Sequence, residues 1–110
     1  MKRARIDSAE GVRSDNPIMV GDVFVQYLNP DSKQISVAVV SFPNGARNVF
    51  HTHAGEQVLV ITEGEGIVAT EDEELLVSAG DVVTIPAGES HWHGARPDTS
   101  MVHLAIMLKA

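Results

Sequence analysis

Four of the five histidines in this 110-residue chain form two His-x-His pairs, His51 with His53 and His91 with His93. Alternate side chains of a strand point to the same side, so both imidazoles of a pair can reach one ion with their Cα atoms ~7 Å apart. A single pair is common on protein surfaces, whereas two pairs on separate strands are rare by chance. The spacing therefore predicts that both segments converge on one metal ion.

A polar amide follows the first pair at the start of an apolar run. Gln57 has the strand parity of His51 and His53, and the break at Ala54-Gly55 is suited to a bend or bulge that turns Gln57 toward the same point. Glu56 has the opposite parity and is expected to point elsewhere unless the bend resets the register.

The remaining histidine, His103, lies in the apolar run MVHLAIML. An imidazole has an ordinary pKa of about 6.5, so His93 and His103 are candidate catalytic acids or bases at neutral pH. We favour His103 as the base, because its otherwise apolar strand would keep it neutral. His93 has an alternative role, which is to steady a metal ligand. The residues expected to line a small apolar pocket beside them are Leu59, Ile61, Ala105 and Met107.

Strand-type periodicity dominates the elements that must position these residues, and no helical period competes with it. Turn signals separate the runs, among them Gly64-Glu65-Gly66, and the acidic residues 71–74 are expected in a hairpin turn. Short strands at roughly ten-residue intervals predict an all-β sandwich or small barrel. The expected strands are residues 22–28, 34–41, 57–62, 66–70, 74–78, 81–85 and 101–108.

Some of these runs, such as VAVV and VLVI, are apolar on both faces. One face can fill the barrel, and the other needs a cover. We expect that cover to be a second copy of the chain in a homodimer. The alternative is that the two sheets of one sandwich, together with the N-terminal segment, cover it within a single chain.

Composition narrows the class of partner. The formal charge of -7 argues against nucleic acid, which needs clustered Lys and Arg. With no apolar segment behind the charged N-terminus, no stretch long enough to span a membrane, and no cysteine, we expect a cytoplasmic protein without membrane partners. The length predicts one domain over residues 1–110, with an N-terminal arm or strand at 1–20 and the barrel at 21–110.

Together, these segments resemble the two conserved motifs of the cupins. The first motif is matched in order and spacing, with Gln57 in the usual glutamate position, by Gly45, His51, His53, Gln57 and Gly64. The second is matched, with Ala95 where asparagine is usual, by Gly80, Pro86, Gly88 and His91. The resemblance implies a double-stranded β-helix, or jelly-roll barrel, with one divalent transition metal held by His51, His53, Gln57 and His91.

Residues 45 to 106 also look like small cupins related to carboxymuconolactone decarboxylase-associated proteins, some of which are manganese-dependent hydroxynitrile lyases. The likeness is carried by HTH followed by Gln, by GDVVTIPAGE and HWHGA, and by HLAI. It implies that His93 and His103 line the pocket. One departure is Met107, which stands where such lyases carry a glutamine and weakens transfer of that activity.

The implied ligand set has no carboxylate, so a bound divalent ion keeps its full charge, polarises a carbonyl or anionic ligand strongly and is retained less firmly. Manganese is our first choice, and iron, nickel, cobalt, copper or zinc also suit three nitrogens and one oxygen. We expect a metal-dependent enzyme acting on a small organic molecule, with lyase chemistry like that of hydroxynitrile lyases. The alternatives are a cupin dioxygenase and a non-catalytic binding or sensor protein for a small ligand.

Overall fold

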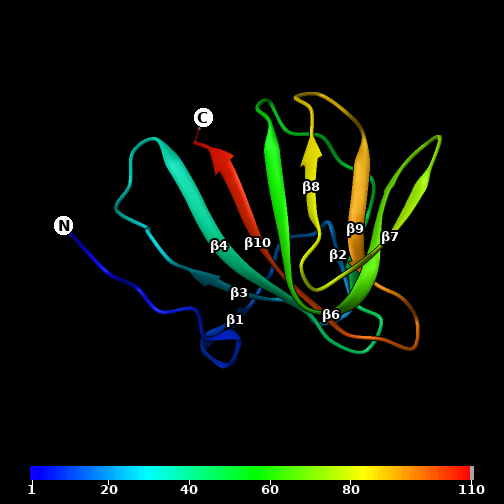
Figure 1. Ribbon diagram of the computed structural model, residues 1–110, viewed down its shortest axis with the longest axis horizontal. Coiled ribbons are helices and arrows are strands. Elements are labelled where there is room, and N and C mark those ends of the chain that lie inside the picture. The colour runs from blue at the N-terminus through cyan, green and yellow to red at the C-terminus, as the bar shows by residue number, and fades with distance from the viewer. Residues whose placement is uncertain (110) are drawn as a thin grey trace.

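The longest strand, β6 (Gln57–Thr70), runs through both sheets of the computed structural model, which describes residues 1–109. Its first half pairs with β10 (Met101–Leu108) and β8 (Val82–Ile85). Its second half pairs with β9 (His91–Ala95) and β7 (Glu74–Ser78). Figure 1 shows β6 bending at the bottom of the view as it passes from one layer to the other.

The first sheet continues outward from β10 through β4 (Ile35–Phe42) and β3 (Phe24–Tyr27) to β1 (Val12–Arg13). A short 3-10 helix, η1 (Ser8–Glu10), precedes β1, and the carboxylate of Asp7 caps it by accepting the Ala9 backbone N–H. Among residues 1–109, no helix has the length and apolar character to cross a membrane.

The second sheet continues from β9 through β5 (Arg47–Asn48) to β2 (Met19–Val20). All strand pairs within the described residues are antiparallel. Two curled antiparallel sheets that share one long strand make the all-β jelly roll, or double-stranded β-helix, that the sequence predicted. The fold class is confirmed.

The turn predicted at Gly64–Gly66 is wrong, because β6 continues through these residues. Backbone pairing persists on both sides of the bend, with Gly64 opposite Met101 and Gly66 opposite Ala95. Gly64 has a φ of 73°, and a Cβ there would overlap the carbonyl oxygen of Ser100. The glycines therefore bend a strand between sheets and do not reverse the chain.

The predicted acidic hairpin turn is confirmed, whereas three short strands were not predicted. The acidic run does form the β6–β7 hairpin turn, in which the Thr70 N–H donates to the Glu73 carbonyl oxygen at 2.9 Å. The sequence missed β1, β2 and β5 as strands. Each of them has only two residues, too few for alternation to be visible.

The core fills the space between the sheets and continues beneath the histidines. Its largest fully buried apolar side chains include Phe42, Leu59, Ile61 and Met101. Phe42 touches the histidine region directly, since its ring centroid lies 5.8 Å from that of His93 and 5.3 Å from that of His103. The packed core thus supports the polar residues above it and limits their movement. The core cluster comprises Val23, Ala38, Val40, Phe42, Ala46, Leu59, Ile61, Val68, Val77, Ile85, Ala95 and Met101.

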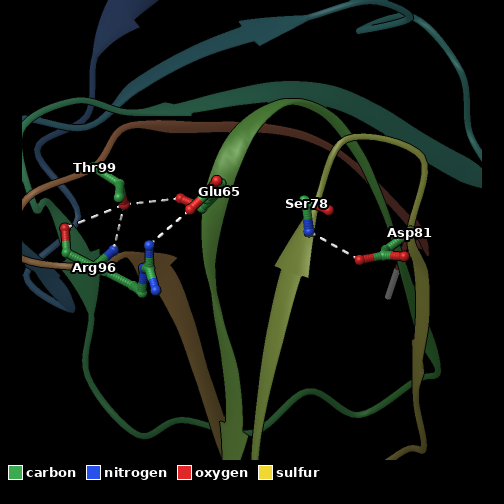
Figure 2. A network of polar contacts seen from close by, with 5 residues as sticks. All are labelled: Glu65, Ser78, Asp81, Arg96 and Thr99. Carbon is green, nitrogen blue, oxygen red and sulfur yellow. Dashed lines mark hydrogen bonds and ion pairs between the residues drawn. The ribbon is translucent and has the colours of Figure 1, made fainter.

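Polar contacts fasten the turn between β9 and β10 to the bend of β6, as Figure 2 shows. The Thr99 hydroxyl donates to the Glu65 carbonyl oxygen at 2.9 Å and accepts the Arg96 backbone N–H at 2.9 Å. The Arg96 guanidinium forms an ion pair with the Glu65 carboxylate at 2.7 Å. On the neighbouring turn, the Asp81 carboxylate accepts the Ser78 N–H at 2.8 Å. These contacts help fix the separation of the two histidine-bearing strands β9 and β10.

Candidate metal centre

The two His-x-His segments lie side by side through a single pair of backbone bonds. The His51 N–H donates to the His91 carbonyl oxygen at 2.9 Å, and the His91 N–H donates back to His51 at 3.0 Å. Two residues after His51 and three residues before His91, the Gly88 N–H donates to the His53 carbonyl oxygen at 2.9 Å. The predicted convergence of the two segments is confirmed in space.

The expectation that His51 and His53 lie on a regular strand is wrong. His51 forms an isolated bridge, and residues 52–56 are irregular up to Gln57, where β6 begins. The bend expected near Ala54-Gly55 is present, because the backbone changes direction at both residues. His91 and His93 do share one face of β9, with rings nearly parallel and centroids 5.7 Å apart.

The imidazoles of both segments form one cluster. Ring centroids are 4.9 Å apart for His51 and His53, 4.4 Å for His51 and His91, and 5.1 Å for His53 and His91. By the distance between ligand atoms, the three histidines placed to bind a metal are His51, His91 and His93, whose nitrogens lie within 4.8 Å of one another. This triad shares two members with the predicted ligand set and contains His93 where that set has His53.

Two of these rings have a fixed orientation. The Nδ1 of His51 lies 2.7 Å from the Val49 carbonyl oxygen, and the Nδ1 of His91 lies 2.8 Å from that of Glu89. A carbonyl oxygen only accepts, so Nδ1 carries the proton in both rings and Nε2 keeps its lone pair. Backbone carbonyls orient metal-binding imidazoles in this manner.

Three polar atoms fit a bound ion particularly well. The Nε2 of His53, the Oε1 of Gln57 and the Nε2 of His91 are buried and have no hydrogen-bond partner within the part of the chain that the structure describes. Buried polar atoms rarely stay unpaired in native proteins, because each loses its hydration without compensation. Imidazole nitrogens and an amide oxygen are ligands that divalent transition metals accept. The residues present therefore fit the metal that the sequence pattern predicted.

Burial favours the neutral state, which metal binding requires, in three histidines of the cluster, His53, His91 and His93. Burial lowers the pKa of His53, and the charges of His51 and His91 lower it further. Burial also lowers the pKa of His91. His93 is fully buried, and its pKa lies well below the ordinary value because of burial first and the neighbouring histidines second.

The predicted acid–base residues form a buried pair. The Nε2 of His103 lies 3.0 Å from the Nδ1 of His93, and both side chains are almost completely excluded from solvent. Burial lowers the pKa of His103 to about 4. Both imidazoles are therefore neutral at pH 7, and each can accept a proton.

A cavity of about 410 Å³ opens beside the cluster. It reaches His51, His53, Gln57, His93 and His103, and its apolar wall includes the predicted Ala105 and Met107. Leu59 and Ile61 were also expected in this wall, but they belong to the core beneath it. On β10, Gln57 lies opposite Met107 and Ile61 lies opposite His103, so residues of the same parity on β6 lie at different depths in the barrel.

Two further parts of the cavity were not predicted from the sequence. One is Asn48 of β5, whose only signal was a polar amide three residues before His51. The other is the segment 14–19, which joins β1 of one sheet to β2 of the other and contributes Ser14, Asp15, Asn16, Ile18 and Met19 to the lining. Trp92 is not part of the cavity lining, and its ring packs against the Arg47 guanidinium, whose Cζ lies 3.5 Å from the ring centroid.

Comparisons with known proteins agree on the fold. The profile of the family described as Cupin domain matches residues 38–107. A cupin-like protein from Thermotoga maritima, solved by crystallography, superposes with a TM-score of 0.82 at 35% identity, covering 88% of this chain and 76% of that one.

Two curated relatives are named as enzymes. The chain is 46% identical over 80 residues to a protein named (R)-mandelonitrile lyase from Granulicella tundricola, covering 70% of this chain and 60% of the relative. It is 38% identical over 65 residues to a protein named acireductone dioxygenase from Parasynechococcus marenigrum, covering 53% of this chain and 35% of that relative. The chain therefore spans less than two thirds of the length of either relative.

Proposed function

This chain belongs to the cupin family, and on that premise we propose that it is a metal-dependent lyase that cleaves or forms a cyanohydrin of a small, partly apolar carbonyl compound. The observation that carries the proposal is the arrangement of a neutral, buried His93–His103 pair beside unpartnered metal-ligand atoms in one cavity. The likeness to a relative named (R)-mandelonitrile lyase supports the choice of reaction.

We assign the metal ligands as His51, His53, Gln57 and His91, with manganese as the first choice of ion. The unpartnered Nε2 of His53 and Oε1 of Gln57 favour this set over the triad that includes His93. When bound, a divalent ion in this neutral donor set supplies Lewis-acid polarisation of an oxygen on the substrate.

The protein's own side chains then manage the proton. In cleavage, the His93–His103 pair accepts the proton of the cyanohydrin hydroxyl, the carbon–oxygen double bond forms, and the carbon–cyanide bond breaks with its electron pair on cyanide. The pair returns the proton to cyanide, so hydrogen cyanide and the carbonyl compound leave with no net charge change. The neutral state of the pair at pH 7 is what lets it accept a proton first.

The cavity wall selects for the organic part of the substrate. Val25, Val40, Ala38, Ala105 and Met107 present aliphatic groups toward the space beside the histidines. Such a wall excludes water from the reacting atoms and buries a compact apolar substituent. Asp15 is the only lining residue with a formal charge at pH 7 among the described residues.

The experiment combines metal loading with one variant. Chelation should abolish turnover of (R)-mandelonitrile, and adding back manganese should restore it. His103→Ala should lower kcat about 10²-fold or more while metal content stays at the unmodified level, because His103 is not a ligand in this assignment. A control variant, Glu73→Ala in the exposed β6–β7 turn, should change neither quantity. Equal turnover by the chelated protein, the His103 variant and the intact protein would rule out the proposal.

A dioxygenase is the second candidate, supported by the relative named acireductone dioxygenase. Oxygen consumption with diketones, measured for each metal added back, separates it from the lyase. Metal-dependent ligand binding without turnover in either assay would leave the binding or sensor role. The single domain over residues 1–110, the homodimer and the cytoplasmic location stay predictions, and light scattering after size exclusion tests the dimer.

A further inference from the structure

A second cavity opens at the rim of the barrel, and none of the roles assigned so far uses it. It lies beside the end of β10, between the starts of β4 and β6 at the top of the view in Figure 1. Its volume is about 580 Å³, within the range of about 300–1,000 Å³ that small-molecule sites occupy. We call it the rim pocket, and the residues that line it but not the cavity beside the histidines are Thr52, Ala54, Gly55, Leu108 and Lys109.

The rim pocket and the cavity beside the histidines have a common wall. The residues that line both are Ser36, His53 and Met107. Met107 shares one face of β10 with His103 and lies four residues further along, about 13 Å at the rise of a strand. A molecule that binds beside His103 and extends toward the rim therefore meets Met107 before it enters the rim pocket.

Met107 is the residue of the common wall that can move aside. It lies opposite Gln57 on β6 and opposite Ser36 on β4, whose short side chain leaves space on that side. The Met107 side chain is unbranched and has three rotatable bonds, so it can adopt another rotamer at low cost. The His53 carbonyl oxygen, by contrast, accepts the Gly88 N–H at 2.9 Å, which ties that part of the wall to the neighbouring turn. Met107 therefore divides the two cavities without closing the passage permanently.

The walls of the rim pocket are mainly apolar. Ala54, Met107 and Leu108 contribute aliphatic groups, and the Leu108 side chain is largely exposed there. The loop that precedes β6 forms the facing wall, because a Cβ added at Gly55 would lie 3.8 Å from the Leu108 Cβ. An apolar group that fills the space between these walls is removed from water, which favours binding.

The one cation beside the rim pocket is engaged elsewhere. The Lys109 ammonium donates to the Pro30 carbonyl oxygen at 3.3 Å and to the Ser32 carbonyl oxygen. The Lys109 backbone N–H donates to the Gln34 carbonyl oxygen at 2.8 Å, which fixes the end of the chain against the start of β4. The ammonium is thus held over the turn before β4. The rim pocket suits an uncharged group better than an anion.

We propose that the rim pocket is a second substrate subsite, which receives the uncharged, apolar distal part of an elongated carbonyl compound, and that Met107 divides it from the cavity in which the reacting group binds. The inference deepens the proposed function and rests on it for the reaction. The substrate class is an aromatic aldehyde, or its cyanohydrin, extended at the ring position opposite the reacting carbon. An extension at that position points away from the reacting carbon and toward the rim.

Binding of alcohols that cannot undergo the lyase reaction tests the subsite without turnover. Benzyl alcohol and 4-phenylbenzyl alcohol are titrated calorimetrically into the full chain loaded with manganese. The elongated alcohol should bind about tenfold more tightly or better, because its second ring is buried in the rim pocket. Equal or weaker binding of the elongated alcohol overturns the inference, whether or not any variant folds.

Leu108→Trp fills the rim pocket from outside the cavity beside the histidines. It should remove most of the preference for the elongated alcohol. Leu76→Trp on β7 is the matched control, because it changes the same residue type at a similar exposure, 69% against 64%, and lines neither cavity. The preference should persist in this control. A preference that is lost in both variants, or in neither, refutes the subsite.

Met107→Ala tests the dividing role of Met107. Removal of the side chain joins the two cavities, so the preference for the elongated alcohol should rise about threefold or more. An unchanged or smaller preference in Met107→Ala would refute Met107 as the residue that divides the cavities.

Kinetics separate this inference from the proposed function. The ratio of kcat/KM for (R)-4-phenylmandelonitrile to kcat/KM for (R)-mandelonitrile should fall about tenfold in Leu108→Trp and stay constant in Leu76→Trp. Turnover of both cyanohydrins at a ratio that Leu108→Trp leaves unchanged would refute the subsite and leave the lyase function intact. No turnover of either cyanohydrin, together with a binding preference that only Leu108→Trp removes, would refute the proposed function and leave the subsite intact.

Discussion

Acid should destabilise this protein through His103, which is buried as a neutral imidazole. Burial lowers its pKa from 6.5 to about 4 in the folded state. A difference of one in pKa between folded and unfolded states is equivalent to about 1.36 kcal/mol. His103 alone therefore makes the free energy of unfolding about 3 kcal/mol smaller once the pH is below both values. His93 acts in the same direction, because its pKa is also lowered by burial.

The sign follows from proton binding. The unfolded chain protonates this imidazole near 6.5, whereas the folded protein does so only near 4. Between these values the unfolded state binds more protons, so the free energy of unfolding falls as the pH falls. Above 6.5 the contribution is fully present, and below 4 the loss is complete. At pH 5, the loss from His103 is about 2 kcal/mol by this relation.

Urea unfolding of the chelated protein at pH ~7.5 and ~5 measures this loss, with His103→Gln as the reference. Chelation matters because metal ligands must be deprotonated, which adds a separate pH dependence. The fifteen carboxylates are the same in both proteins, so the difference between the two profiles isolates the imidazole. The unmodified protein should lose about 2 kcal/mol more than His103→Gln. Parallel profiles would refute a neutral, buried His103.

Two further predictions test the metal ligands and the approach of β5 to β9. Gln57→Glu should tighten metal binding about 10- to 100-fold, because a carboxylate adds a negative charge to a neutral donor set. A metal titration measures the affinity, with Gln34→Glu at an exposed position as the control. Equal affinities of the two variants would count against Gln57 as a ligand. Gly94→Ala should lower the free energy of unfolding by about 2 kcal/mol or more in urea, because the added Cβ would overlap Arg47 across the β5–β9 contact. Gly55→Ala, whose Cβ would meet only Leu108 at 3.8 Å, should be nearly neutral, and equal losses for both variants would contradict this steric reason.

The sequence predicted the structure correctly where a residue pattern has one physical explanation. Its alternating apolar runs predicted strands at 74–78 and 101–108 with the observed bounds, because a half-buried strand imposes a period of two. The same kind of pattern led to the wrong prediction of a turn at Gly64–Gly66. A glycine pair breaks the pattern whether the chain reverses or bends, and only pairing with β9 and β10 distinguishes these outcomes.

The sequence by itself showed which donor groups are available near one another, because imidazoles and an amide oxygen at this spacing are ligands that a divalent metal accepts. Tertiary structure decided how they meet: His51 reaches His91 through one backbone bridge and not through a regular strand. It also decided that Asn48 faces His93 and that residues 14–19 close the cavity. These contacts join positions far apart in the chain, and a linear pattern records only the periodicity of each segment and not the partner against which it packs.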